Sequence, residues 1–195
     1  MKLADSLRDL ARHLRAIHVD FAVIGGLAAS ARGEARFTRD IDIAVSVEGD
    51  TRAEEILFEL GQRGHRVIAT VEQELVGRLA TARSIDARGV VCDLVFATCG
   101  VEREVVALAQ EIELFPGADL PTASVEALLA MKTLSAVPAR PRDLGDIQAM
   151  VRANPEFDEN VVHGLLMTIE ARGYARGQVL MKKWEELKRQ LQLGE

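Results

Sequence analysis

The sequence is poor in the residues that mark several specialised protein classes. It has two cysteines, Cys92 and Cys99, which exclude a disulfide framework and leave no second pair for a zinc site. Aromatic residues make up 4% of the chain, and no apolar run is long enough to cross a bilayer. The charged N-terminal segment lacks the apolar core of a signal peptide. We therefore expect a cytoplasmic protein with reduced thiols and no membrane partner.

Basic residues are also fewer than acidic residues in this chain. The chain has 24 Lys and Arg against 30 Asp and Glu, giving a net charge of −6. This balance argues against a protein that coats nucleic acid through bulk electrostatics. A local basic groove stays open, because arginines cluster within 32–39 and within 140–142. With 48% apolar residues, the 195-residue chain can bury one sizeable core with at most two small lobes.

The periodicity of apolar residues divides the chain into an α/β half, residues 1–120, and a helical half, residues 121–195. We therefore predict an α+β fold in which a C-terminal helical bundle follows the sheet. The predicted strands are 21–25, 39–47, 65–71, two strands within 77–97 joined by a turn near 86–89, and 111–115. The segment 116–124 is predicted to form turns. The predicted helices are 3–17, 27–32, 51–64, 125–135, 141–153, 159–171 and 175–191.

Two aspartates separated by one residue stand out in the stretch RDIDIAV. Because alternate side chains of a strand point to the same side, Asp40 and Asp42 are predicted to share a face. Carboxylates this close repel each other unless a cation lies between them, and Mg²⁺ is commonly held by one or two carboxylates together with substrate phosphates. The alternative interpretation is an edge strand with a solvated face.

A glycine pair precedes these aspartates. Gly25 and Gly26 lie between a predicted strand and a predicted helix, where backbone amides can approach a phosphate at the helix N-terminus. A Gly-Gly turn also occurs for purely steric reasons. The order of strand, Gly-Gly, helix and D-x-D strand is more informative than the glycines alone.

A third aspartate lies in the apolar run VVCDLVF. An ionised Asp93 buried there without a partner would be costly, so either a bonded partner or a metal must account for it. If its strand lies beside 39–47, three carboxylates converge on one site, as two-metal phosphoryl transfer requires. A buried aspartate bonded to an arginine or to backbone amides is the alternative.

Two blocks of the sequence resemble known families. The stretch GGLAASARGEARFTRDIDI resembles the signature of DNA polymerase β-like nucleotidyltransferases, in the form where Gly-Gly replaces Gly-Ser and an R-x-T-x-D-x-D run follows. That run consists here of Arg36, Thr38, Asp40 and Asp42. The second block, ASVEALLAMKTLSAVPARPRDLGDI, is similar to the downstream helical motif of AbiEii-type nucleotidyltransferase toxins. The resemblance covers about residues 20 to 150 and implies a nucleotidyltransferase-like mixed β-sheet with flanking helices.

In that family, a lysine on one helix and a basic-Asp-x-x-Asp segment on the next face the nucleotide. The matching positions here are Lys132, Arg142, Asp143 and Asp146. A lysine emerging from an otherwise apolar helix is a suitable point charge for a triphosphate, although it is equally typical of a lysine snorkelling at a helix edge. Asp143 can also favour the helix N-terminus after Pro141. We therefore favour Asp146 for a site role, paired with Lys132.

The resemblance implies a metal-dependent enzyme that moves an NMP from an NTP to an acceptor hydroxyl. It implies Mg²⁺ or Mn²⁺ as cofactor, with the metal ions held by Asp40, Asp42 and Asp93. In the implied scheme, Asp93 would also help to deprotonate the attacking hydroxyl. The implied nucleotide-binding residues are Gly25, Gly26, Arg36, Thr38, Lys132 and Asp146. The family further implies a toxin acting on tRNA or protein, with a cognate antitoxin or a second copy as partner. A small-molecule adenylyltransferase is a variant of the same class.

Two other interpretations remain open at this stage. The chain could be a non-catalytic nucleotide-binding or partner-binding module, antitoxin-like or a pseudoenzyme, on the same fold. Retention of all three aspartates argues against that, while the missing serine after Gly25 argues for it. The other alternative is an unrelated α/β protein with chance motifs. A stripe including Leu180, Trp184 and Leu187 on the last predicted helix fits either internal packing or a partner surface.

Overall fold

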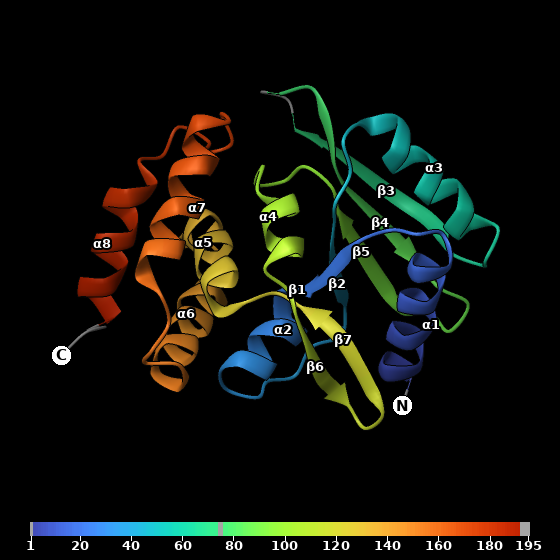
Figure 1. Ribbon diagram of the computed structural model, residues 1–195, viewed down its shortest axis with the longest axis horizontal. Coiled ribbons are helices and arrows are strands. Elements are labelled where there is room, and N and C mark those ends of the chain that lie inside the picture. Colours follow the sequence, from blue (N-terminus) through green and yellow to red (C-terminus); the bar gives the residue numbers. More distant parts are fainter. Residues whose placement is uncertain (1, 74–75, 192–195) are drawn as a thin grey trace.

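In the described part of the chain, residues 2–73 and 76–191, a seven-stranded mixed β-sheet is flanked by helices on both faces (Figure 1). The structure is a computed structural model. The strands are β1 (Phe21–Ile24), β2 (Ile41–Val45), β3 (Arg66–Gln73), β4 (Arg78–Ile85), β5 (Val91–Val95), β6 (Gln110–Phe115) and β7 (Ala118–Thr122). The helices are α1 (Lys2–Ala16), α2 (Gly25–Arg32), α3 (Asp50–Gly61), α4 (Glu102–Ala107), α5 (Val125–Ser135), α6 (Pro141–Ala153), α7 (Glu159–Ala171) and α8 (Leu180–Leu191). The predicted α+β class is therefore confirmed.

The strand order is β3-β4-β5-β2-β1-β7-β6. Strand β1 runs antiparallel to β2, whereas β2 and β5 are parallel. The end of β1 and the beginnings of β2 and β5 therefore lie at the same edge of the sheet. Any side chain near these three ends is brought to one place, although the segments are far apart in the sequence.

Each face of the sheet packs against its own set of helices. On one face, α1 and α3 pack against the sheet through a buried cluster that includes Leu10, Ile56 and Ile43. On the other face, a second cluster joins α2 and α4 to the four C-terminal helices, and includes Ala44 of β2 and Trp184 of α8. Figure 1 shows these helices on the opposite side of the sheet from α1 and α3.

This second cluster extends across the predicted boundary between residues 120 and 121. Ile24 and Val95 of the sheet belong to the same buried cluster as Leu128 and Ile147 of the helical half. The helical half therefore packs on the sheet half through shared apolar contacts. The division into two domains, 1–120 and 121–195, stays a prediction.

The local signals that begin the site helices are clear in the structure. The Ser124 side chain caps α5 by accepting a hydrogen bond from the backbone N–H of Ala127 at 3.2 Å. Pro141 begins α6, where its missing N–H costs no helical hydrogen bond. In α8, Leu180, Trp184 and Leu187 are buried, so most of the predicted stripe packs internally.

Several predicted elements were wrong or misplaced. The segment 116–124, predicted to form turns, contains strand β7, which pairs with β6 on one side and with β1 on the other. Pairing on both sides outweighs the weak strand preference of a segment containing Pro121. Helix α4 was not predicted, and residues 175–179 do not join α8, because Arg176 and Gly177 adopt left-handed φ angles of 54° and 72°.

One further observation concerns membranes. Among the described residues, no helix combines the length and the apolar character needed to span a bilayer.

Candidate active site

The end of β1 and the beginnings of β2 and β5 bring together two of the predicted aspartates, Asp42 and Asp93, whereas the donor atoms of Asp40, Asp42 and Asp93 do not all lie within 4.8 Å of one another. Asp42 pairs in register with Ile24 of β1 and with Asp93 of β5. The two aspartates thus lie side by side on neighbouring parallel strands. Asp40 was predicted to lie inside a strand, but β2 begins at Ile41, and Asp40 occupies a bend just before it. Its proximity to Asp42 therefore does not depend on strand alternation.

The first glycine makes room for a catalytic candidate. Gly25 has a left-handed φ of +62°, and a Cβ added there would lie 2.0 Å from Oδ2 of Asp42. Both the backbone conformation and the close approach require a residue without a side chain. The turn between β1 and α2 therefore fits directly against the Asp42 carboxylate.

The second glycine accommodates the loop between α2 and β2. A Cβ on Gly26 would lie 2.8 Å from Oγ1 of Thr38 and 3.1 Å from Nη2 of Arg36. Ser30 also fixes this loop, because its hydroxyl donates to the carbonyl of Gly26 at 2.8 Å and accepts from the backbone N–H of Arg36 at 3.4 Å. The predicted phosphate contact of the two glycines stays a prediction, while their packing role is visible in the structure.

The Asp42 carboxylate carries negative charge that its surroundings do not balance. Its pKa is raised to about 6, first by burial and then by the nearby charges of Asp93 and Asp40. A hydrogen bond from the backbone of Gly26 and the charge of Lys132 oppose this effect without cancelling it. An oxygen donor in this state fits a hard divalent cation, which would supply the missing positive charge.

Asp93 has a partner in the structure. The Arg83 guanidinium of β4 donates two hydrogen bonds to it, from Nε to Oδ1 at 2.8 Å and from Nη2 to Oδ2 at 2.7 Å. The two residues are directly opposite each other in the β4–β5 ladder. The alternative interpretation of Asp93, an aspartate bonded to an arginine, is therefore observed, and its metal-binding role stays a prediction.

The helix side of the site is a closed network of charges. Nζ of Lys132 on α5 lies 2.6 Å from Oδ1 of Asp143 and 2.7 Å from Oδ2 of Asp146, both on α6. Arg36 donates to Asp146 from Nε at 2.8 Å and from Nη2 at 3.0 Å. Ser135 donates to the other oxygen of Asp143 at 2.9 Å. Both α6 carboxylates thus contact the lysine.

The charges in this network compensate one another. Burial raises the pKa of Asp146, but hydrogen bonds from Arg36 and Lys132 outweigh it, so the pKa lies below its ordinary value. The structure therefore brings Arg36, Lys132 and Asp146 together, as their predicted role requires. Asp143, which we had ranked below Asp146, is equally engaged with Lys132.

Two functional candidates were missed from the sequence. Arg83 and Ser135 each hold a site carboxylate. Arg83 lies outside both motif blocks, whereas Ser135 lies within the second block but was not singled out there. The sequence does contain a signal for Arg83, because a hairpin with a turn near 86–89 places Arg83 nearly opposite Asp93 on the next strand. An error of one residue in the turn length, however, reverses the face on which it lies.

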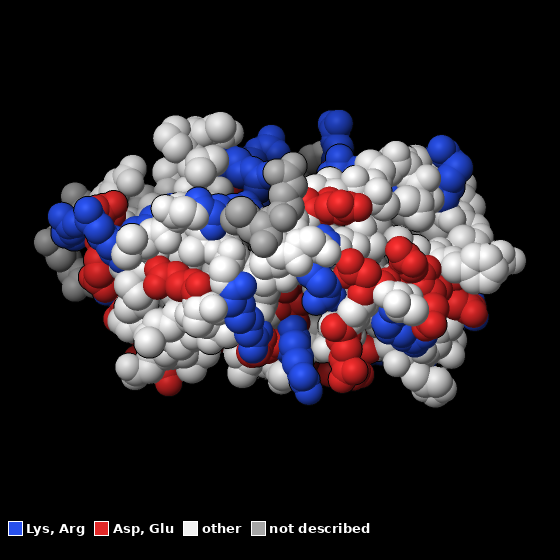
Figure 2. All heavy atoms as spheres, turned by 90° about the horizontal axis from the view of Figure 1, so that it is seen from above, with Lys and Arg blue, Asp and Glu red and all other residues white. Residues whose placement is uncertain are grey.

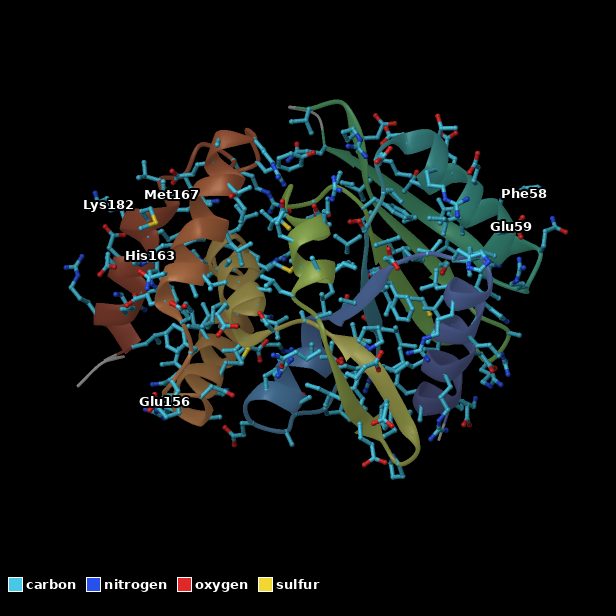
Figure 3. The ribbon with its side chains drawn as sticks, viewed as in Figure 1. Phe58, Glu59, Glu156, His163, Met167 and Lys182 are labelled. Atoms are coloured by element: carbon cyan, nitrogen blue, oxygen red, sulfur yellow. The ribbon has the colours of Figure 1, made fainter. Side chains whose placement is uncertain are left out.

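The described residues hold one group of three ligand-type side chains whose donor atoms lie within 4.8 Å of one another: Glu159, His163 and Glu185. This group lies on α7 and α8, with His163 labelled in Figure 3, and not at the β2–β5 site. Lys188 pairs with both glutamates, at 2.5 and 2.9 Å, so a cation already compensates them. We assign no metal to this group.

The solved structures most informative about the fold are nucleotidyltransferases. ANT(2'')-Ia in complex with adenylyl-2''-tobramycin aligns with a TM-score of 0.57 and 17% identity, covering 88% of this chain and 99% of that one. An antigenic nucleotidyltransferase-like protein from Paracoccidioides brasiliensis aligns with a TM-score of 0.50 and 20% identity, covering 94% and 89%. At such identities these likenesses establish the fold and not the substrate.

The sequence itself matches a family over almost its whole length. Among curated proteins, none matches this chain. Residues 8–193 match the family described as nucleotidyl transferase AbiEii toxin, type IV TA system. The chain therefore belongs to the AbiEii nucleotidyl transferase toxin family, and its fold is that of a nucleotidyltransferase.

Proposed function

We propose that the protein is a Mg²⁺- or Mn²⁺-dependent nucleotidyltransferase that moves an NMP from an NTP to an acceptor hydroxyl. The observation that carries this proposal is the partly buried, uncompensated carboxylate of Asp42, which packs against Gly25 at the edge of the sheet that also holds Asp40 and Asp93. Family membership supports the same reaction class.

In the proposed reaction, the acceptor oxygen bonds to the α-phosphorus of the NTP, and the bond from that phosphorus to the bridging oxygen breaks, releasing pyrophosphate. Asp93 would accept the hydroxyl proton. Asp40 and Asp42, with Asp93, would hold the divalent ions, which supply positive charge to the triphosphate and lower the pKa of the attacking oxygen. The remaining chemistry is positioning and electrostatic stabilisation.

The remaining predicted residues would position the nucleotide. The backbone amides at Gly25 and Gly26, at the N-terminus of α2, are suited to phosphate oxygens. Lys132 and Arg36 would contribute positive charge to the triphosphate, oriented by Asp146. Thr38 fixes the loop that carries Arg36 through its close packing on Gly26.

The family description, a toxin of a TA system, supports a macromolecular acceptor, either tRNA or protein. The structural neighbour bound to an adenylylated antibiotic supports a small acceptor instead. On the face shown in Figure 2, Lys and Arg side chains are interspersed with Asp and Glu. That face does not favour an extended RNA track, so the acceptor is left to the transfer experiment below. A cognate antitoxin or a second copy stays the predicted partner.

The first test is a thermal-shift titration of the wild type and Asp42→Asn with each of the four NTPs, with and without Mg²⁺. A ligand at one hundred times its Kd adds about 2.7 kcal/mol of stability. We expect a Mg²⁺-dependent rise in Tm for at least one NTP, lost in Asp42→Asn and retained in the control Asp119→Asn, which changes an exposed carboxylate on β7. No shift at millimolar NTP would contradict the proposal.

The second test identifies the acceptor. The NTP that gives the shift is labelled at its α-phosphate and incubated with total tRNA, with total protein, or with aminoglycosides, each with the wild type and Asp42→Asn. Label that moves to one acceptor class with the wild type alone defines the substrate. Labelled NTP binding without transfer to any class would favour the non-catalytic module.

A further inference from the structure

Arg83 occupies a place in the site that none of the sequence motifs explains. Its guanidinium binds Asp93 in a bidentate ion pair, and Asp93 in turn lies beside Asp42 across the parallel β5–β2 pair. The three residues therefore form a row across β4, β5 and β2. Arg83 is the cation at the outer end of that row.

The pair is asymmetric in its access to solvent. The Asp93 side chain is 12% exposed, whereas that of Arg83 is 50% exposed. Asp93 is thus fixed by its strand, while the guanidinium reaches it from the solvent side on a flexible stem. Such an arginine can leave without disturbing the buried core.

A second arginine in the site provides the contrast. Arg36 also forms a bidentate pair, with Asp146, but its side chain is 30% exposed and Asp146 is held by Lys132 as well. The charge of Asp146 is therefore compensated by two cationic side chains. Among the described residues, Asp93 is paired with one cation, Arg83, and the carboxylate of Asp42 next to it remains uncompensated.

We propose that Arg83 is a built-in counter-ion that competes with a divalent cation for Asp93. In this proposal, which rests on the proposed function, the guanidinium limits the repulsion between Asp93 and Asp42 until a divalent ion displaces it into solvent. Arg83 therefore sets the metal concentration at which the Asp93 side of the site is filled. It is a positioning residue and takes no part in bond making.

The test is a titration of the full-length chain with Mn²⁺ at pH 7.5, in which free Mn²⁺ is measured by electron paramagnetic resonance. The variants are Arg83→Gln, Arg83→Lys, Asp42→Asn and the control Arg88→Gln. Arg88 lies in the β4–β5 turn and pairs with Asp9 at 2.7 Å, so its replacement removes an arginine from the same hairpin but not from the site.

We expect Arg83→Gln to bind Mn²⁺ about five- to tenfold more tightly than the wild type, because it removes a charge-assisted but half-exposed competitor. Arg83→Lys keeps the charge without the bidentate geometry, so its Mn²⁺ affinity is expected to lie between those of the wild type and Arg83→Gln. Arg88→Gln should match the wild type. Mn²⁺ should also raise the Tm of Arg83→Gln more than that of the wild type. Far-UV circular dichroism checks that each variant is folded.

Each outcome separates this inference from the function on which it rests. If Arg83→Gln and Arg83→Lys bind Mn²⁺ no more tightly than the wild type, while Asp42→Asn loses binding, Arg83 does not compete and the metal site stands. If Arg88→Gln tightens binding as much as Arg83→Gln, the effect is one of general charge and the inference is wrong. If the wild type binds no Mn²⁺ with or without NTP, the inference and the metal-dependent function fail together.

Discussion

The two sides of the candidate site handle charge in different ways. On the strand side, Asp42 is partly buried next to the buried Asp93, and its charge is left uncompensated by its neighbours. On the helix side, Asp146 is buried and contacts both Arg36 and Lys132. The helix side is therefore complete without a ligand, whereas the strand side is arranged for a cation that the chain supplies only in part.

This difference indicates that the helix side contributes mainly to stability and the strand side mainly to ligand binding. A closed network of buried charges contributes to a unique arrangement of helices on the sheet, because removing one partner leaves the other charges buried and unpaired. An uncompensated carboxylate instead lowers stability and raises affinity for a positively charged ligand. Substitutions on the two sides should consequently affect different measurements.

The largest effect is expected for Asp42→Asn on the strand side. Loss of this ligand should lower kcat for nucleotidyl transfer by at least about a thousandfold, since electrostatic stabilisation at the reacting centre is lost. The free energy of unfolding should not fall, because the substitution removes a desolvated charge and keeps the shape. Pyrophosphate release and urea unfolding measure the two quantities. Activity within tenfold of the wild type would exclude Asp42 from the reacting centre.

The counterpart on the helix side is Asp146→Ala. Its removal leaves Lys132 and Arg36 each short of a buried partner, so the free energy of unfolding should fall by about 3 kcal/mol. Urea denaturation measures the loss. Asp119→Ala, at an exposed position, should change stability by less than about 0.5 kcal/mol. A loss at Asp146 no greater than at Asp119 would show that the network does not stabilise the fold.

Gly25→Ala tests whether the turn after β1 sets the position of the strand-side carboxylate. The left-handed backbone should cost about 1–2 kcal/mol of stability. The added Cβ also meets Asp42, and its displacement should lower kcat by about a hundredfold. Gly117→Ala is the matched control, because its φ is +70° but nothing lies within 4 Å of the added Cβ. If both variants keep full activity, Gly25 serves the turn alone.

The smallest effect is the pH dependence of stability. Since burial raises the pKa of Asp42 to about 6, the folded chain holds a proton between about pH 4 and 6 that the unfolded chain has released. Stability from this group is present at low pH and is lost as the pH rises through that window. Without divalent ions, the wild type should lose about 2 kcal/mol relative to Asp42→Asn from pH 4 to 7.

The comparison of the two unfolding curves, recorded in urea at each pH, isolates the contribution of Asp42 from those of the other carboxylates. A constant difference between wild type and variant across this range would mean that Asp42 titrates normally. The Mn²⁺ affinity of the wild type should rise as the pH increases through the same window, because the proton and the metal compete for the same oxygens.

The fold class and most of the elements around the site could be predicted from local patterns. Apolar alternation predicted the strand that contains β2, the apolar run VVCDLVF predicted the strand that contains Asp93, and Pro141 marked the start of α6. β7 could not be found in this way, because Pro121 weakens its local preference and its pairing with β1 and β6 decides its conformation. Strand pairing between distant segments is not encoded in a short window.

By itself, the sequence determined which chemical groups were available: the Gly-Gly turn, the D-x-D pair, Asp93, and the lysine and aspartates of α5 and α6. The tertiary structure decided which of them are compensated. The parallel pairing of β2 and β5 sets Asp42 beside Asp93, the β4–β5 hairpin register delivers Arg83 to Asp93, and helix packing brings Arg36 to Asp146. Charge compensation depends on distances between residues far apart in the chain, which only the folded structure fixes.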